Sequence, residues 1–304
     1  MTDATEKVWA STEPCTACNW TPELQSQCHY ESHVRLFYGA STRGIWSIGS
    51  DVILKERPSE GPKAEVRTLK YLARHASGIP VPRAIRDWVD SKNRYFVMTE
   101  RIQEQTLEEA WSSLSIEKKT AIADQLVDVR QQLRALTSPA IQDVDGEPCV
   151  PALLIPAKEP MSLFHSDAEL WDAINLHLQK LNVPPKASDS LRARFPKCKP
   201  YVLTHCDLNL DNVIVKDGKL AGILDWEFAA FNPIWYEYVS ASWGWTEEDY
   251  EWKKLLQGRM RQSNDGYEEA EEFWRDLRKM KTYPNLDEKG KEVSESLLEG
   301  KKYI

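Results

Sequence analysis

The first third of the chain has short apolar runs separated by turn-forming residues, a pattern that predicts β-strands. The segments VRLFYG, GIWSIG and DVILK lie within residues 34–55, and the run RYFVMTERI covers residues 94–102. Between them, residues 62–74 have the spacing of an amphipathic helix with a proline in its first turn. We expect a small β-rich unit over residues 31–102, preceded by an N-terminal arm at residues 1–30.

Beyond this unit the apolar spacing becomes that of helices. Thr106 and Glu109 stand at the two ends of a capping box, which opens a helix. Residues 116–136 carry one continuous apolar stripe, and a second capping box opens a helix over residues 166–181. The chain from residue 103 to residue 304 is therefore predicted to be a larger, mainly helical unit.

Two stretches inside the helical unit are predicted to be loops. Residues 137–165 are rich in proline, aspartate and glycine, and residues 182–200 lack a clear apolar period. No internal repeat or low-complexity tract interrupts the chain.

The strongest local signal is a β-hairpin in the second half. Three short β-rich runs cover residues 201–204, 213–215 and 220–224. Asp217 and Gly218 lie between the last two, and this pair favours the positive φ angles of a two-residue hairpin turn. Asn212 precedes one hairpin strand and Asp225 follows the other. Because a hairpin brings its two ends together, we expect these two side chains to be neighbours.

The same stretch contains the spacing H-x-D-x-x-x-x-N, formed by His205, Asp207 and Asn212. Phosphoryl transfer from a nucleotide needs a group that orients the attacking hydroxyl and oxygen ligands for Mg²⁺. Asp207 is the candidate catalytic base, and Asn212 with Asp225 are the candidate metal ligands. His205 is placed at the catalytic site as a brace for the loop. Asp and Asn are also common in ordinary loops, but their combination with the hairpin favours a site.

An ion pair is predicted in the first unit. Glu65, Leu69 and Leu72 share one face of the predicted helix, so a carboxylate lies on the apolar stripe. A carboxylate that faces a core needs a partner, and Lys55 at the end of the apolar run 52–54 is the natural one. The alternative is a lysine at a strand end that faces water.

These motifs resemble those of a known family. Residues 205–212, followed by Ile-Leu-Asp-Trp-Glu at residues 223–227, resemble the signature of the aminoglycoside phosphotransferase and choline kinase-like group. Asp-Trp-Glu in place of Asp-Phe-Gly is typical of this group rather than of protein kinases, and residues 228–238 look most like fungal members. Cys206 is a departure, because the family usually has Gly or Arg there.

The resemblance implies an α+β, bilobal protein-kinase-like fold, with a small antiparallel sheet as N-lobe and a larger helical C-lobe. It implies that Lys55 contacts the α and β phosphates of ATP. It also implies that Ser41 and Thr42 lie in the phosphate loop, although this loop lacks G-x-G-x-x-G and a plain β-turn is equally compatible. The backbone around Glu100 and Ile102 would bind the adenine edge.

Composition and charge narrow the function classes. The 304 residues are 41% apolar and 28% charged, as in an ordinary globular protein. No apolar stretch approaches the ~18 residues of a membrane span, and the start has no signal-peptide progression. We therefore expect a cytoplasmic protein without a membrane partner. The net charge of −8 argues against a nucleic-acid partner. A monomer and a homodimer both fit.

Acidic clusters at residues 247–249 and 268–272 could attract a cationic acceptor, or could simply form solvated helix faces. Aromatic residues also gather late in the chain, at positions 235, 236, 238, 243, 245, 250 and 252. Most are expected in the core. Trp243 or Trp245 could form a cation–π wall for an ammonium substrate.

Cysteine usage leaves two interpretations of the N-terminal arm. Cys15 and Cys18 form a C-x-x-C pair, and Cys28 and His29 follow. This could hold zinc, but a second ligand pair at matching spacing is missing from the sequence. Reduced free thiols are the expected state.

The sequence thus predicts an ATP- and Mg²⁺-dependent phosphotransferase that moves the γ-phosphate to a hydroxyl of a small-molecule acceptor. The alternative is a catalytically inactive kinase-like protein that binds a nucleotide or small ligand without transfer. The complete set of polar residues favours the enzyme: Lys55, Glu65, Asp207, Asn212 and Asp225. Cys206 and the absence of G-x-G-x-x-G from the phosphate loop are the only features that favour the inactive alternative.

Overall fold

The computed structural model describes residues 34–40, 42–61, 63–149, 151–155 and 162–300. The predicted N-terminal arm, with Cys15, Cys18 and Cys28, lies outside these residues, as does Ser41. All statements below concern the described part of the chain.

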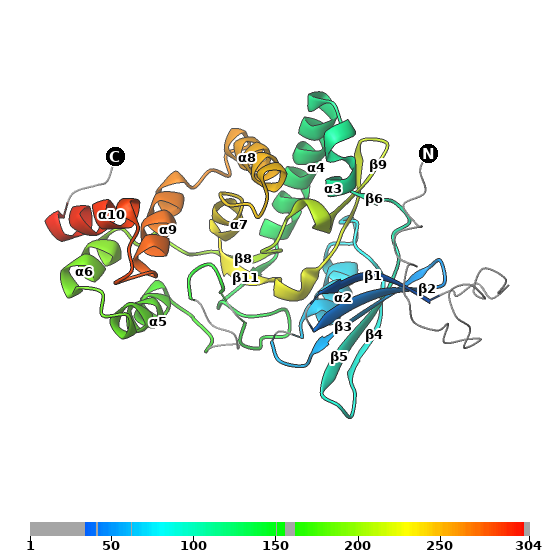
Figure 1. Ribbon diagram of the computed structural model, residues 1–304, viewed down its shortest axis with the longest axis horizontal. Coiled ribbons are helices and arrows are strands. Elements are labelled where there is room, and N and C mark those ends of the chain that lie inside the picture. The colour runs from blue at the N-terminus through cyan, green and yellow to red at the C-terminus, as the bar shows by residue number, and fades with distance from the viewer. Residues whose placement is uncertain (1–33, 41, 62, 150, 156–161, 301–304) are drawn as a thin grey trace, which may run out of the picture.

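A five-stranded antiparallel sheet forms the N-terminal part (Figure 1). Its strands, in the order β1-β2-β3-β5-β4, are β1 (Val34–Ala40), β2 (Arg43–Ile48), β3 (Val52–Pro58), β5 (Arg94–Glu100) and β4 (Ala84–Val89). The four apolar runs recognised in the sequence became strands of this sheet. β5 alternates buried and half-buried residues, as expected for a strand covered on one face.

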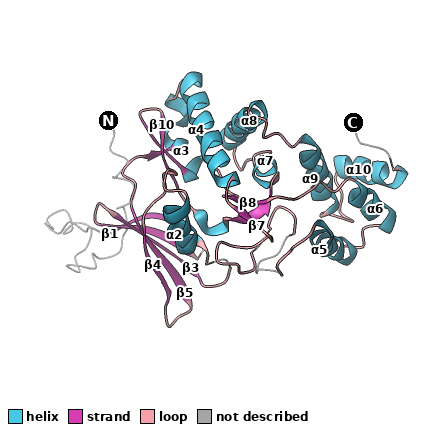
Figure 2. Ribbon diagram, turned by 180° about the vertical axis from the view of Figure 1, so that it is seen from behind, coloured by secondary structure: helices cyan, strands magenta, loops and turns pink. Residues whose placement is uncertain are grey.

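Helix α2 (Glu65–His75) packs against this sheet, as Figures 1 and 2 show. Leu69 and Leu72 are buried on its inner side, which confirms the predicted apolar face. The helix begins at Glu65 rather than near residue 62, so the predicted first-turn proline precedes it. Glu65 therefore occupies the first helical turn, where a carboxylate also interacts favourably with the helix dipole.

The rest of the chain is mainly helical. Its longer helices are α4 (Ile116–Arg134), α5 (Asp167–Lys180), α6 (Pro185–Ala193), α8 (Glu247–Gln262), α9 (Glu268–Met280) and α10 (Glu288–Glu299). Shorter ones are α3 (Leu107–Ala110), η2 (Trp111–Ser113), η3 (Leu210–Asn212), η4 (Trp226–Phe228) and α7 (Tyr236–Ser240). The capping box of Thr106 and Glu109 is present as predicted.

The prediction of a loop over residues 182–200 was wrong, because α6 forms within it. Pro185 is the first residue of this helix, a position where the missing N–H of proline costs no hydrogen bond. Ala187 and Leu191 then point into the core. Two successive prolines therefore start a helix here rather than exclude one.

Two small sheets support the residues between α6 and α7. One contains β6 (Gln105–Thr106), β9 (Val213–Lys216) and β10 (Lys219–Ile223), and the other contains β7 (Thr137–Ser138), β8 (Tyr201–Thr204) and β11 (Ala230–Pro233). β9 and β10 form the predicted hairpin, with φ of 52° at Asp217 and 78° at Gly218. Both turn residues thus have the positive φ that the Asp-Gly pair predicted.

A single apolar cluster runs from α2 through α4 to α10 and includes the buried residues of β8 and β9. In Figures 1 and 2, helices α5, α6, α9 and α10 gather at the end of the molecule far from the five-stranded sheet. The sheet of β7, β8 and β11 and helix α7 lie between these two ends, whereas β6, β9 and β10 lie on the side of the five-stranded sheet. None of the helices in the described ranges is long and apolar enough to cross a membrane.

Candidate active site

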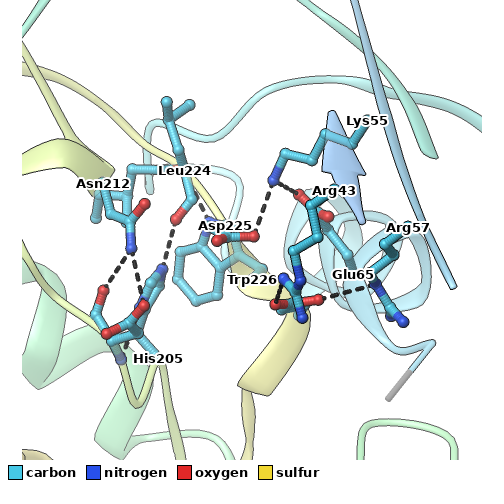
Figure 3. A network of polar contacts seen from close by, with 12 residues as sticks. Arg43, Lys55, Arg57, Glu65, His205, Asn212, Leu224, Asp225 and Trp226 are labelled. Carbon is cyan, nitrogen blue, oxygen red and sulfur yellow. Dashed lines mark hydrogen bonds and ion pairs between the residues drawn. The ribbon is translucent and has the colours of Figure 1, made fainter. Parts of the chain in front are cut away.

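The predicted ion pair between Lys55 and Glu65 is present. The Nζ atom of Lys55, on β3, lies 2.6 Å from Oε1 of Glu65 on α2. The same Nζ atom lies 2.9 Å from Oδ1 of Asp225, which follows the hairpin. One ammonium thus joins the sheet, its helix and the hairpin end (Figure 3).

The three groups shift one another's protonation. Burial opposes the charge of Lys55, but Asp225 and Glu65 outweigh it and raise the pKa of the ammonium above its ordinary value. Burial likewise opposes the charge of Asp225, yet the Lys55 ammonium holds the pKa of that carboxyl below its usual range. Burial raises the pKa of Glu65 to about 7, although Lys55 acts in the opposite direction. Lys55 and Asp225 are therefore charged at neutral pH.

A second ion-pair group beside this one was missed by the sequence analysis. Oε1 of Glu227 lies 2.8 Å from Nη1 of Arg43 on β2, and its Oε2 lies 3.1 Å from Nε of Arg57 on β3. The Glu227 side chain is only 6% exposed. The glutamate of Asp-Trp-Glu thus attaches η4 to the five-stranded sheet, two residues after Asp225, and Figure 3 shows Arg43 and Arg57 on the same side as Lys55 and Glu65. The available signal was an acid directly after a buried tryptophan.

Asp207 and Asn212 meet in the loop between β8 and β9. The Nδ2 group of Asn212 donates to Oδ2 of Asp207 at 3.1 Å and to its backbone oxygen at 2.9 Å. The amide of Asn209 donates to Oδ1 of Asp207 at 2.5 Å. Burial raises the pKa of Asp207, while His205 and Lys253 lower it. The carboxylate is thus oriented on both oxygens by amides.

His205 braces this loop, as expected from the sequence. It is fully buried, and its Nε2 donates to the backbone oxygen of Leu224 at 2.7 Å, while its Nδ1 accepts from the N–H of Asp207 at 3.2 Å. The N–H of Leu224 in turn donates to the backbone oxygen of Asn212 at 2.8 Å. A continuous set of hydrogen bonds therefore fixes Asp207, Asn212 and Asp225 relative to one another.

Glu237 anchors the start of the loop and was not recognised from the sequence. It lies on α7, is 1% exposed, and its Oε2 accepts from the N–H groups of His205 at 2.6 Å and Cys206 at 3.2 Å. The signal for it was an acid surrounded by aromatic residues in Trp-Tyr-Glu-Tyr. Such an acid is either exposed or satisfied in the core, and here it is satisfied by backbone donors.

Cys206 has φ of 74°, in the left-handed region. This explains physically why glycine suits the position, since a Cβ is strained there. The thiol lies 3.1 Å from Oγ1 of Thr204 and accepts from Nδ2 of Asn232 at 3.3 Å. Burial, with Glu237 nearby, raises the pKa of the Cys206 thiol, so it is not an activated nucleophile.

Helix α8 holds the other side of the loop. Nε1 of Trp252 donates to the backbone oxygen of Leu208 at 3.0 Å, and the N–H of Leu210 donates to Oδ1 of Asp249 at 3.2 Å. The interpretation of residues 247–249 as one solvated acidic face is therefore wrong for Asp249, which is buried. Nothing in the sequence separates Asp249 from the other acids of this cluster. In the structure, Asp249 accepts from the loop and lies 3.8 Å from Nζ of Lys253.

Thr42, Glu100 and Ile102 were predicted to lie near the nucleotide. Thr42 is exposed between β1 and β2, and its backbone oxygen accepts from Arg94 at 2.6 Å. At the end of β5, the N–H of Glu100 already donates to the backbone oxygen of Arg83. Ile102 packs against Gly222 of β10, where a Cβ would not fit. The adenine and phosphate contacts predicted for these residues stay predictions.

The oxygens left over after these bonds fit a hard divalent cation. Asn212 uses its Nδ2 group on Asp207, so its Oδ1 is the oxygen left for another partner. Asp225 uses Oδ1 on Lys55, which leaves Oδ2. One amide oxygen and one ionised carboxylate are the ligand types that Mg²⁺ takes beside phosphate oxygens. In Figure 3, Asp225 lies between Asn212 and the Lys55–Glu65 pair.

Most of the aromatic residues between positions 235 and 252 are buried, as expected. Trp235, Tyr236, Tyr238 and Trp252 are buried, whereas Trp245 is 72% exposed and Tyr250 is not in the core. Trp243 is half-buried and already has the guanidinium of Arg278 over its ring. A cation of the protein itself thus occupies the ring considered for a substrate ammonium.

The antiparallel sheet above a helical part that carries this loop defines the class: it is the protein-kinase-like fold of the aminoglycoside phosphotransferases. Residues 39–273 match the model of the phosphotransferase enzyme family, and the chain belongs to that family. The family resemblance and the fold class predicted from the sequence are thereby confirmed. No curated protein has a significant sequence match to the chain.

Solved structures show the same fold at low sequence identity. A thermostable mutant of aminoglycoside phosphotransferase APH(4)-Ia, in a ternary complex with AMP-PNP and hygromycin B, is 15% identical, with a TM-score of 0.58 over 91% of this chain and 96% of that one. ADP-bound APH(2'')-Ib is 14% identical, with a TM-score of 0.54 over 92% and 96%. The streptomycin–ATP complex of APH(2'')-IIa is 13% identical, with a TM-score of 0.55 over 92% and 95%.

Proposed function

We propose that this protein is an ATP- and Mg²⁺-dependent phosphotransferase that transfers the γ-phosphate to a hydroxyl of a small molecule. The observation that carries the proposal is the contact of one half-buried ammonium, Lys55, with both Glu65 and Asp225, beside the bonded pair Asp207 and Asn212. The nucleotide complexes of the similar structures support a nucleotide as the donor. Residues 31–102 are assigned to nucleotide binding, and residues 103–304 carry the catalytic loop and the acceptor site.

Each residue has a role that follows from its contacts. Lys55, held by Glu65, supplies a fixed positive charge for the phosphates of the donor. Asp207, oriented by Asn209 and Asn212, accepts a hydrogen bond from the acceptor hydroxyl and then its proton. Asn212 and Asp225 would hold Mg²⁺, which supplies neutralisation of phosphate charge when bound.

A catalytically inactive relative is the weaker proposal. Inactivity would be expected from loss of one of the proposed catalytic groups, and all five are present. Lys55 contacts Glu65 and Asp225, and Asn212 contacts Asp207. The φ of Cys206 also leaves the loop in a conformation that a glycine would adopt, so this departure does not argue for decay. We further propose a cytoplasmic protein, monomeric or homodimeric.

Calorimetric titration of Mg²⁺-ATP tests the proposal. Wild type and Asp207→Ala are expected to bind Mg²⁺-ATP, whereas Asp225→Ala should lose the metal-dependent part of the binding. Asp217→Asn is the matched control, because Asp217 is an exposed acid at the hairpin tip whose positive φ suits Asn. Absence of Mg²⁺-ATP binding by the wild type would refute the proposed enzyme, as would sustained transfer by Asp207→Ala.

A further inference from the structure

A cationic cluster lies at the C-terminal end of α9, outside the site described above. Its members are Arg278 and Lys281, with the rings of Trp243 and Trp274. The guanidinium carbon of Arg278 lies 5.2 Å from the ring centroid of Trp243 and 5.4 Å from that of Trp274. A guanidinium over aromatic rings uses its faces, so its in-plane N–H donors stay available for an oxyanion.

Lys281 completes the cluster one helical turn further on. Its Nζ donates to the backbone oxygen of Leu153 at 2.7 Å, an oxygen that also accepts from Nε1 of Trp274 at 3.1 Å. Burial first, and then the charge of Arg278, lower the pKa of Lys281 to about 8. His177, on α5, is a further basic group that interacts with Lys281. This is a partly desolvated ammonium surrounded by other basic groups.

The nearby carboxylates are already paired with other cations. Asp276 lies 2.9 Å from Nη2 of Arg194, and Asp287 lies 2.6 Å from Nζ of Lys279. Among the described residues, no carboxylate lies within ion-pair distance of Arg278 or Lys281. Two clustered cations without an anion make a site that an external oxyanion would stabilise.

The cluster is attached to the catalytic loop through α7. The N–H of Leu153 donates to the hydroxyl of Tyr236, next to the Glu237 that anchors the loop. On the other side, Trp243 follows closely after Ser240, whose hydroxyl donates to the backbone oxygen of Cys206 at 3.3 Å. The cluster and the residue preceding Asp207 are thus linked through α7 and the residues that follow it.

We propose that Arg278 and Lys281, framed by Trp243 and Trp274, bind an oxyanion of the acceptor, so that the acceptor is a hydroxyl compound with a carboxylate or phosphate rather than a polyamine. This rests on the proposed phosphotransferase function. The rings of Trp243 and Trp274 position the guanidinium of Arg278 for this contact.

The test uses compounds that differ only in charge. Glucuronate, glucose 6-phosphate, glucose and glucosamine share one ring and present a carboxylate, a phosphate, no charge and an ammonium. Shikimate and its methyl ester, and glycerate and glycerol, repeat the comparison on other skeletons. Binding to the wild-type protein with Mg²⁺-ADP is measured by calorimetry, and transfer is measured as ADP release with Mg²⁺-ATP.

We expect the anionic members to bind more tightly than their neutral partners and glucosamine to bind least. Arg278→Gln and Lys281→Met should each weaken anion binding about 10-fold or more, because each removes a charge-assisted hydrogen bond. Neutral members should be unaffected. Arg275→Gln is the matched control, since Arg275 is an exposed arginine on the same helix, and it should change binding less than about twofold. Thermal unfolding checks that each variant folds.

Three outcomes would overturn the inference. They are no binding of any anion up to about 20 mM, equal binding of anions and their neutral partners, or equal anion binding by the wild type and both variants. A preference for carboxylate over phosphate, or the reverse, supports the inference and identifies which oxyanion the acceptor carries. Because Mg²⁺-ATP titration is run on the same samples, failure of the nucleotide site is distinguished from failure of the anion site.

Discussion

Two partly buried lysines, Lys55 in the candidate active site and Lys281 outside it, have opposite electrostatic surroundings. Lys55 contacts two carboxylates, which raise the pKa of its ammonium against the effect of burial. Lys281 contacts a backbone oxygen and neighbours Arg278, so burial lowers its pKa to about 8. The partner, rather than the burial, decides the direction of the shift.

The different surroundings of the two lysines suit them to different roles. A lysine with its counter-charges built in is a permanent part of the structure, and it keeps its position whether or not phosphates are present. A lysine without a neighbouring carboxylate gains most of its electrostatic stabilisation from an anion that binds from solution. Two of the four changes below, at Lys55 and Lys281, test this contrast, and the other two test the supports around Lys55 and the catalytic loop. They are given from the largest expected effect to the smallest.

Lys55→Met should have the largest effect. It leaves Glu65 and Asp225 without their cation, and we expect about 3 kcal/mol lower free energy of unfolding, as for a broken buried ion pair. The kcat/KM for phosphoryl transfer should fall about 10³-fold, because the fixed charge opposite the phosphates is lost. Chemical denaturation and ADP release measure the two effects. Lys70→Met, on the exposed side of α2, is the control and should change neither.

Glu227→Gln should have the next largest effect, and it breaks the attachment between η4 and the sheet. Arg43 and Arg57 would lose a carboxylate that is 6% exposed. We expect about 2 kcal/mol lower free energy of unfolding, with a smaller loss of nucleotide affinity. Urea denaturation measures it, with the exposed Glu60→Gln as control. Equal stability of the two variants would show that the attachment contributes nothing.

Lys281→Met should act in the opposite direction and stabilise the free protein by about 1 kcal/mol at pH 7. The folded protein binds the Lys281 proton more weakly than the unfolded chain, whose lysine keeps its ordinary pKa of 10.5. The wild type therefore loses stability at and below pH 8 and recovers it as the pH rises to about 10.5. Trp274 still donates to the oxygen of Leu153, so no buried acceptor is left unpaired.

Denaturation of Lys281→Met and wild type at several pH values measures this difference. The two curves should converge between pH 8 and about 10.5. Lys254→Met, an exposed lysine on α8, should show no such convergence. A destabilised Lys281→Met at pH 7 would mean that the ammonium already has a compensating partner, and would remove the contrast with Lys55.

Cys206→Gly should have the smallest effect. Glycine removes the strain of φ 74° but loses the contacts of the thiol with Thr204 and Asn232, so transfer should stay within about threefold of wild type. Cys206→Ala keeps the Cβ and loses the same contacts, and it should be about 1 kcal/mol less stable than Cys206→Gly. Equal stability of the two variants would mean that the loop relaxes.

Much of the nucleotide side could be predicted because its signals are local. The Asp217–Gly218 pair determines the hairpin, and the hairpin places Asn212 near Asp225. Glu65 on an apolar face identifies Lys55 as its partner. In each case a short stretch of chain contains its own geometric constraint, so periodicity and turn chemistry suffice.

The supports of the loop could not be predicted in the same way. Glu237 and Asp249 are buried because distant backbone N–H groups need acceptors, and nothing within a few residues of either acid shows this. Arg278 lies over Trp243 only because α9 packs beside α7. α6 was missed for a different reason, since Pro185 both discourages a helix interior and favours a helix start. Tertiary contacts, not local pattern, decide these features.

The hairpin turn also has a practical consequence for protein engineering. The hydrogen bond from Leu224 to Asn212 closes the hairpin at its base, whereas Asp217 is exposed at its tip. The chain between Lys216 and Lys219 can therefore be lengthened without changing the separation of the two candidate metal ligands, provided that a positive-φ turn is kept. A peptide tag or a fluorescent label grafted there would mark the molecule at the far end of the hairpin from the candidate active site, and would leave Asn212 and Asp225 in place.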